Sequence, residues 1–379
     1  MWWGGGAAAA PLGVAIALAI SVSCDQGSVG SQSTPSPIAG ATASPQPIRL
    51  VAHTVVALGP HVVAALDCDS QQVAWPTNSQ PIADQQVPHR DAIEVVSLSG
   101  GTPRVVARSA HGGDLDSPVP ITDSWLVYIE YRQHLNTFSA DFWYLSSVNL
   151  VTKEVRQLAS ATAGAELNEL PRYSASDGRV VWDQFDPSGA PILRLYDFGS
   201  AKESTLDLPP GTFPINPVIS QNKVVFIDNS TDPNSASEDW LGRRGSLRLF
   251  DIPTGQTTTL DQEPTAFMAQ IGGSHVVWFG MPAQVKTVPL GGGKVTVIGN
   301  YSGIPQTNGS IVVWYDSRAL GFLVFGLGDG HVTPLQVADW PDPRGNFALC
   351  GSRLYFALSP DLEAGTSTIR YVDLAGITV

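Results

Sequence analysis

The sequence is short of cysteine, methionine and basic residues. It carries 3 cysteines and 3 methionines in 379 residues, and 21 Lys and Arg against 34 Asp and Glu, for a formal net charge of −13. Nucleic-acid binding needs clustered Lys and Arg to neutralise phosphates, so this balance argues against nucleic acid as a partner. A metal cation or a cationic partner is more compatible with it.

Segments with helical periodicity are also scarce. The 37 glycines and 29 prolines lie between short apolar runs, a pattern typical of many strands joined by turns. A chain of this length could form two domains, but all-β and repeat proteins often form one unit of this size. We therefore expect an all-β chain.

Common enzyme motifs are absent from the sequence. It contains no Gly-x-Ser-x-Gly, no His-Glu-x-x-His and no phosphate-binding Gly-Lys-Ser/Thr. A glycosidase needs only two carboxylates at a suitable separation, so a glycan-active or other hydrolytic enzyme is one alternative. Binding without catalysis is the main hypothesis, and a purely structural envelope scaffold is a third.

The N-terminus is predicted to be an export signal. Residues 1–24 contain an apolar core, Ala7 to Ile20, that is too short to span a membrane comfortably. Residues 25–47 are rich in Ser, Pro, Gly and Ala and are expected to form a disordered tether. The folded domain is then residues 48–379.

A cysteine followed by such a tether resembles a bacterial lipoprotein. The resemblance implies lipid attachment at Cys24 and a place at the outer face of a bacterial membrane, periplasmic or cell-surface. Two features depart from the pattern: no Lys or Arg precedes the apolar core, and Ser21 stands where such signals usually carry Leu. Ordinary signal cleavage and an uncleaved anchor are the alternatives.

An apolar pair followed by an aromatic recurs along the remaining chain, with starts 36 to 64 residues apart. The copies are Val62-Val63-Ala64, Leu126-Val127-Tyr128, Val180-Val181-Trp182, Val224-Val225-Phe226, Val276-Val277-Trp278, Val312-Val313-Trp314 and Leu354-Tyr355-Phe356. This spacing of strand-rich units predicts a seven-bladed β-propeller of four-stranded antiparallel blades. Six blades is the alternative, because the first copy has Ala64 in the aromatic position.

The last copy lacks one strand, and the chain has a spare one before the first copy. We expect Ile48 to His53 to pair with the last blade and close the ring, since an open propeller would expose two sheet edges. The alternative is that this segment is the frayed end of the tether.

The repeat unit resembles that of TolB-type propellers. Arg179 to Leu206, Lys223 to Leu260 and Ser310 to Leu335 share a strand with Val-Trp or a similar pair, an acid-rich turn and a strand of the Leu-Tyr-Asp-Leu type. The resemblance covers the chain from Ile48 onward and implies the fold. It implies no role in the Tol envelope system, because TolB carries a separate N-terminal domain.

Two cysteines remain in the predicted domain. In the repeat register Cys350 ends a first strand and Cys68 ends a second strand, which places them near opposite edges of the sheets. A strand of about six residues spans roughly 20 Å, beyond the reach of a disulfide. Two unpaired thiols are therefore expected, with a disulfide as the alternative.

The connections from second to third strands, and from fourth strands to the next first strands, emerge on one face, which we call the loop face; the other is the turn face. Most acids are predicted to lie on the loop face, where a one-signed surface would attract opposite charge. Acids recur near the aromatic position: Asp67, Glu130, Asp183, Asp228 and Asp316. They could bind a cation or basic ligand, or cap turns through backbone N–H groups.

Other candidates lie close by. Arg318 follows Asp316 on the same turn, and Trp340 could stack on a sugar or a peptide. Asp228 and Asp232 have the spacing of a weak calcium loop without its glycine, so no cofactor is predicted and calcium is a minor alternative. The expected partner is an envelope protein, a peptide or a glycan, bound by a monomer that meets the membrane only through its N-terminal anchor.

Overall fold

The computed structural model describes residues 47–59, 61, 63, 65–79, 89–116, 118–133, 140–162, 169–232, 243–300, 304–316, 318, 321–337, 347–358, 367–375 and 377. In these ranges all regular elements are β-strands apart from one short 3-10 helix, η1 (Asn229–Thr231). None of the described segments forms a helix long and apolar enough to cross a membrane. Cys24, Trp340 and the predicted tether up to residue 46 lie outside the described residues.

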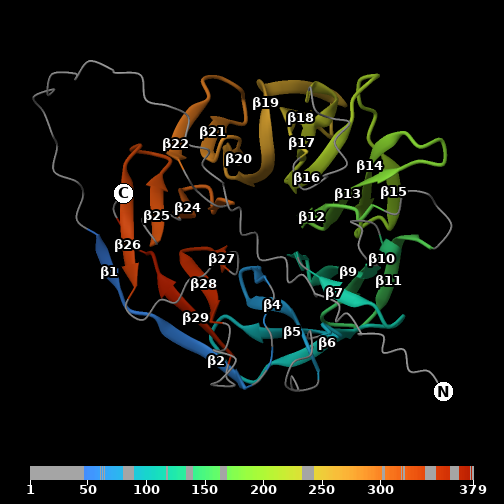
Figure 1. Cartoon of the computed structure of the whole chain (residues 1–379). Helices are drawn as coiled ribbons and strands as arrows, with labels where there is room; N and C mark the ends of the chain where they lie inside the picture. Colours follow the sequence, from blue (N-terminus) through green and yellow to red (C-terminus); the bar gives the residue numbers. More distant parts are fainter. Residues whose placement is uncertain are drawn as a thin grey trace, which may run out of the picture.

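The strands form mostly four-stranded, antiparallel sheets arranged around a central axis (Figure 1). One sheet contains β3 (Asp67–Cys68), β4 (Gln72–Thr77), β5 (Ala92–Ser97) and β6 (Arg104–Arg108). The next contains β7 (Asp114–Asp116), β8 (Ile121–Thr122), β9 (Trp125–Gln133), β10 (Ala140–Asn149) and β11 (Val155–Ala161). It is followed by β12 (Tyr173–Ser176), β13 (Arg179–Phe185), β14 (Pro191–Asp197) and β15 (Lys202–Thr205).

A seven-stranded sheet comes next in the chain. It contains β16 (Pro214–Ser220), β17 (Lys223–Asp228), β18 (Gly245–Asp251), β19 (Gln256–Gly272), β20 (His275–Gly280), β21 (Gln284–Pro289) and β22 (Thr296–Asn300). The 17 residues of β19 pair with β18 through their first part and with β20 through their last part. This strand is therefore the fourth strand of one repeat and the first strand of the next.

The last two sheets take their outermost strands from the N-terminal segment. One contains β23 (Gln306–Thr307), β24 (Ile311–Asp316), β25 (Gly321–Gly326), β26 (Val332–Val337) and, parallel to β26, β1 (Ile48–Leu50). The other contains β27 (Phe347–Cys350), β28 (Arg353–Leu358), β29 (Ser367–Asp373) and β2 (His53–Gly59). The strand paired with the last sheet is thus β2, which begins at His53, and the first half of the expected segment, Ile48 to Leu50, pairs with β26 instead.

Each repeat buries one large aromatic side chain on its second strand. These residues are Trp75, Tyr128, Trp182, Phe226, Trp278, Trp314 and Phe356. Each belongs to a core cluster with side chains of the preceding repeat around the ring; Trp182, for example, packs with Trp143 and Leu145 of β10. Burial of a side chain of this kind stabilises the fold by about 1.5–3 kcal/mol or more. The aromatic triplet therefore marks the contact between neighbouring sheets.

The expected register of the first copy is wrong. Its second strand is β4, where Val73, Ala74 and Trp75 supply the apolar pair and the aromatic, and Trp75 is fully buried. Val63 precedes this sheet without belonging to a strand, and residues 62 and 64 lie outside the described ranges. The first copy has an aromatic after all, so the reason given for the six-bladed alternative disappears.

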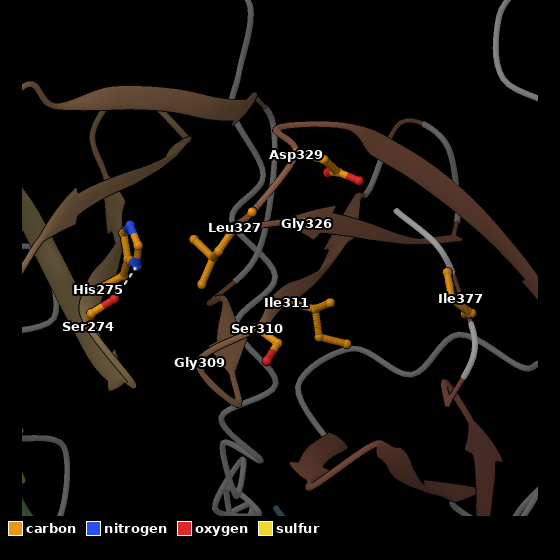
Figure 2. Close-up of a pocket in the computed structure, with 10 residues that line it drawn as sticks. Ser274, His275, Gly309, Ser310, Ile311, Gly326, Leu327, Asp329 and Ile377 are labelled. Atoms are coloured by element: carbon orange, nitrogen blue, oxygen red, sulfur yellow. Dashed lines mark hydrogen bonds between the residues drawn. The ribbon is translucent and has the colours of Figure 1, made fainter.

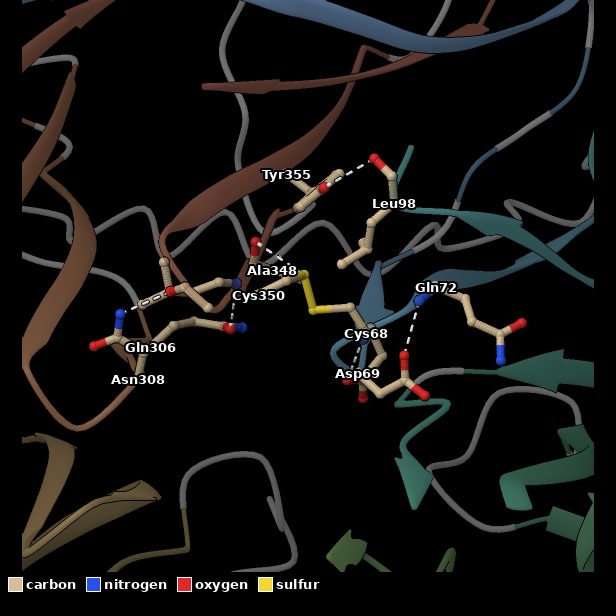
Figure 3. The surroundings of a disulfide bond; sticks show 12 residues. Cys68, Asp69, Gln72, Leu98, Gln306, Asn308, Ala348, Cys350 and Tyr355 are labelled. Carbon is tan, nitrogen blue, oxygen red and sulfur yellow. Dashed lines mark hydrogen bonds between the residues drawn. A yellow bond between two sulfur atoms is a disulfide. The ribbon is translucent and has the colours of Figure 1, made fainter. Parts of the chain in front are cut away.

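The expectation of two unpaired thiols is also wrong, since Cys68 and Cys350 form a disulfide. The shifted register of the first copy explains this error. Cys68 ends β3 and Cys350 ends β27, so both cysteines end first strands, at the same edge of adjacent sheets and with Cα atoms 6.0 Å apart. Figure 3 shows the bond joining the first sheet to the last, near the hydrogen bond from the Tyr355 hydroxyl to the Leu98 carbonyl (3.4 Å). Trp75, Val96 and Tyr355 share one core cluster across this contact.

We expect the disulfide to contribute strongly to stability, because it joins cysteines separated by 282 positions. The double substitution Cys68→Ala and Cys350→Ala should lower the free energy of unfolding by about 2–4 kcal/mol, through greater freedom of the unfolded chain. Chemical denaturation with and without reductant measures this. Reductant should destabilise the wild type to the level of the double variant and leave that variant unchanged; equal stability of all four samples would contradict the assignment.

Candidate functional site

Three of the recurring acids hold the backbone at the start of their own sheet. Glu130 on β9 accepts the N–H of Gly113, the residue before β7 (3.1 Å). Asp183 on β13 accepts that of Arg172, the residue before β12 (2.6 Å), and Asp228 on β17 that of Phe213, the residue before β16 (3.0 Å). We call this hydrogen bond, from the N–H of the residue before a first strand to a carboxylate on the second strand, the carboxylate clasp. In these three positions the turn-capping interpretation is confirmed.

Such contacts occupy most of the hydrogen-bonding capacity of the Glu130 and Asp228 carboxylates. Glu130 is 3% exposed and also accepts hydrogen bonds from Ser109 Oγ, from the N–H groups of Ala110 and His111, and from the His111 ring. Asp228 is 1% exposed, caps Ser230 and forms an ion pair with Arg248 (2.8 Å). Hydrogen bonds to the charged form lower the pKa of Glu130, against the opposing effect of its burial.

Asp183 differs because its second oxygen reaches into the next repeat. Oδ2 accepts the N–H of Asn216 on β16 (2.9 Å), and the Asn216 side chain donates to the Phe267 carbonyl on β19 (2.8 Å). The register of β16 shifts between Ile215 and Val218, and Asn216 has a positive φ of 51°. This bulge turns the Asn216 N–H toward Asp183 and leaves the carboxyl half-buried between two repeats.

A cavity of about 40 Å³ opens at this carboxyl on the loop face. Its lining comes from the connection into β12, the end of β13 and the start of β14. The start of β16, the residue before it and one residue shortly before β18 complete it. The lining residues are Glu169, Leu170, Pro171, Arg172, Asp183, Gln184, Phe185, Pro191, Phe213, Pro214, Ile215, Asn216 and Arg243. We call it the Asp183 pocket.

The Asp183 pocket has an apolar wall and a wall of paired charges. Phe185 and Phe213 meet edge to face, with ring centroids 6.0 Å apart. Arg243 donates two hydrogen bonds to Glu169 (2.8 and 2.9 Å), and its guanidinium lies 5.8 Å from the centre of the Phe213 ring. Concave sites that combine apolar rings with a few fixed polar groups are typical of ligand binding.

Burial raises the pKa of Asp183 to about 7, and this effect exceeds the opposing effects of the N–H groups of Arg172 and Asn216 and of the Arg172 charge. Burial also lowers the pKa of Arg172 below its ordinary value. Carboxyl groups that titrate near neutrality inside a cleft mark candidate functional sites.

A separate polar network lies along the innermost strands of the neighbouring sheets. Asp116 on β7 accepts from Arg90 (2.7 Å) and from the Tyr131 hydroxyl (3.1 Å). Its charge also raises the pKa of Tyr173 on β12, after the larger effect of burial. Tyr173 donates its hydroxyl proton to the Pro118 carbonyl. These contacts connect the first three sheets, and the residues that make them do not line the Asp183 pocket.

The other predicted site residues lie apart from this pocket, and the predicted loop-face position of Asp67 is wrong, because the corrected register places it in a first strand, close to the turn into β4 on the turn face. Asp67 lies in β3, where its carboxylate accepts the Cys68 N–H (2.8 Å) and burial raises its pKa to about 6. Asp316 ends β24 and accepts the N–H of the exposed Arg318 (2.8 Å). Asp232 faces Arg244 at 3.7 Å. Within the described ranges, no three His, Cys, Asp or Glu side chains group closely enough to bind a metal ion.

A larger cavity, of about 530 Å³, lies on the turn face, at the tight turns beside β20, β24 and β25 (Figure 2). Ser274 and His275 contact each other (3.2 Å) on one side of it, and Figure 2 shows Asp329 and Ile377 on the other. The Ser, His and Asp therefore do not form a catalytic triad. The cavity is wide and shallow, whereas the smaller Asp183 pocket brings together a perturbed carboxyl and aromatic rings.

The pocket residues other than Asp183 were not predicted from the sequence. A partial signal exists: Arg172 and Phe213 each immediately precede a first strand and donate the N–H of a carboxylate clasp. An alignment of the repeats on their first strands would have placed these two residues at equivalent positions. Nothing in the sequence identifies Gln184, Glu169 or Arg243.

No protein-family model matches the chain, and no curated protein matches it in sequence. Solved structures match its fold. The β-propeller domain of the Trilobed protease from Pyrococcus furiosus aligns with a TM-score of 0.52 and 11% identity, over 78% of this chain and 91% of that one. An oligogalacturonate lyase in complex with manganese aligns at 0.54 and 11%, over 88% and 99%. A prolyl endopeptidase aligns at 0.57 and 13%, over 85% of this chain and 48% of that one.

These likenesses, together with the radial sheets, show that the chain has a β-propeller fold. Identities this low show the fold alone. The resemblance to the TolB-type repeat remains a prediction.

The raised pKa of Asp183 predicts how stability depends on pH. Its carboxyl titrates near 3.8 ordinarily and near 7 in the folded protein, so the folded state holds this proton to higher pH. The resulting contribution to stability is complete below about pH 4 and is lost as the pH rises through about 7. The free energy of unfolding of the wild type minus that of Asp183→Asn should therefore fall between these values and level off above them.

Denaturation of both proteins across this pH range measures the difference. Asp67, with a pKa raised to about 6, titrates in both proteins and cancels in the comparison. A difference that stays constant or increases with pH would contradict the raised pKa of Asp183.

Proposed function

We propose that the chain is an exported β-propeller that binds a partner protein or ligand through its loop face, without catalysis. The observation that carries this proposal is the Asp183 pocket, where a half-buried carboxyl with a pKa near 7 adjoins a wall of aromatic side chains. Rigid sheets hold the connections that line it, and binding sites are commonly built on such connections. An envelope protein, a peptide or a glycan is the expected partner.

We infer seven blades and a closed ring. β19 serves two repeats, so the seven-stranded sheet counts as two blades and every aromatic second strand has its own blade. Two contacts support closure between the first and last sheets: β2 pairs with β29, and Cys68 is bonded to Cys350. A closed ring leaves no open sheet edge at that junction. A monomer of the TolB-like type fits this architecture.

Export is supported by the disulfide, because such bonds persist in oxidising compartments outside the cytosol. The apolar core from Ala7 to Ile20 and the following Cys24 supply a signal and a site for lipid attachment. We therefore propose a lipid-anchored protein on the outer face of a bacterial membrane. The tether would join the propeller at β1, on the outer edge of the β23–β26 sheet.

A photo-crosslinking amino acid placed on either face of the full-length protein tests the proposal. Ser188 is exposed on the connection between β13 and β14, beside the Asp183 pocket, and Asp329 is exposed on the turn face. We expect p-benzoylphenylalanine at position 188, and not at position 329, to form an adduct of defined mass in cells of the native host. Adducts formed only from position 329, or equally from both positions, would overturn the assignment to the loop face.

A hydrolytic function is the second candidate, and the pKa of Asp183 favours it, because a carboxyl that titrates near 7 can act as a general acid. This function predicts that the wild type releases product from aryl glycosides or peptides and that Asp183→Asn lowers the rate by about 10²–10⁴-fold. Comparison of product release by the two proteins, with folding verified by circular dichroism, decides the question. Equal rates or no release would remove this candidate.

A further inference from the structure

The size of the Asp183 pocket limits what can enter it. Its volume is about 40 Å³, and a buried water needs roughly 10–15 Å³ on this measure. The cavity therefore has room for about three or four non-hydrogen atoms. This matches the side chain of valine or leucine beyond its Cα, and excludes an indole ring unless Phe185 and Phe213 move apart.

The charges around the cavity are balanced. Glu169 is paired with Arg243 through two hydrogen bonds, and the charge of Asp183 is offset by Arg172, which acts on its pKa. Two acidic and two basic side chains line the cavity, so neither sign is in excess. A fully charged ligand would lose its hydration without meeting an uncompensated charge, which disfavours binding.

The hydrogen-bonding groups that remain are one donor and one acceptor. Gln184 Oε1 accepts the Trp182 indole N–H (2.7 Å), which leaves the side-chain amide nitrogen as a donor without a partner among the described residues. Each oxygen of Asp183 accepts one backbone N–H and retains a second lone pair. A peptide group carries one N–H donor and one C=O acceptor, and so complements this pair.

The geometry points to a peptide ligand: an extended segment of a partner protein inserts one small aliphatic side chain beside Phe185 and Phe213, and its peptide group meets Asp183 and Gln184. This assignment rests on the proposed function, and it names the chemistry that the loop face recognises. Specificity comes from the small volume of the pocket, which accepts valine or leucine and rejects larger side chains, and from its balanced charges, which disfavour charged side chains.

Binding should also be linked to pH. A peptide N–H that donates to Asp183 stabilises the ionised carboxylate, so it lowers the pKa of this group. By linkage, affinity for the peptide rises as the pH increases through about 7, the pKa of Asp183 in the protein without ligand. A purely apolar contact at Phe185 and Phe213 would leave the affinity independent of pH in this range.

The test uses the whole chain and blocked amino acids as probes. N-acetyl-leucine methylamide, the tryptophan analogue and the lysine analogue differ only in the side chain, and protein-observed NMR measures their dissociation constants. We expect the leucine probe to bind at least about tenfold more tightly than the other two, and more tightly at pH 8 than at pH 6. Tightest binding of the lysine probe, or equal binding of all three, would overturn the assignment.

Phe213→Ala supplies a second, independent test because it enlarges the cavity. The variant should lose about tenfold in affinity for the leucine probe and gain affinity for the tryptophan probe. Phe279→Ala is the matched control, since Phe279 forms a similar edge-to-face pair with Phe267 (6.2 Å) and does not line the pocket. An unchanged preference in Phe213→Ala, or the same change in Phe279→Ala, would contradict the proposed ligand position.

The two proposals can fail separately. Adducts from position 188 combined with no selectivity among the probes would retain the binding face and reject the aliphatic peptide ligand. Adducts from position 329 alone would reject the binding face itself.

Discussion

The carboxylate clasp is the interaction on which the loop face depends. The backbone must leave one sheet, cross to the next and enter its innermost strand, and the N–H at that point has no partner within a sheet ladder. A carboxylate in the second half of the second strand accepts it in three successive repeats, from Gly113, Arg172 and Phe213. A buried N–H without an acceptor would cost about 1–3 kcal/mol. The clasp therefore fixes the walls from which the Asp183 pocket is built.

The repeat pattern made much of the fold predictable. An aromatic at a fixed place on each second strand is required because neighbouring sheets pack face to face, and only large side chains fill that contact. Six of the seven predicted triplets lie in the second strands observed, from Tyr128 to Phe356. The first copy failed because Val62, Val63 and Ala64 imitate the apolar part of the triplet. One displaced strand was enough to separate Cys68 from Cys350 in the predicted register and so to disfavour the disulfide.

The candidate site was less predictable, and the reason is physical. In the sequence Glu130 and Asp228 stand two residues after the aromatic position and Asp183 only one, yet all three form the same clasp. They differ in what the rest of each carboxylate meets: the His111 ring for Glu130, the Arg248 guanidinium for Asp228, and the Asn216 N–H for Asp183. That last contact depends on a bulge in a strand of the next repeat. The pocket also needs Arg243 and Glu169, which lie 74 positions apart. Strand periodicity carries no information about such contacts.

The structure also changes the meaning of the chain's acidity. A net charge of −13 indicates an attraction for cations, but a count of charges does not show which carboxylates face solvent. On the loop face Glu130 is enclosed by five hydrogen bonds, Asp228 is paired with Arg248, and Glu169 with Arg243. Carboxylate oxygens that already accept N–H groups or face a guanidinium have little capacity left to coordinate a cation. These acids thus order the connections, and the recognition proposed for the Asp183 pocket relies on its shape and hydrogen-bonding groups instead of on an excess of negative charge.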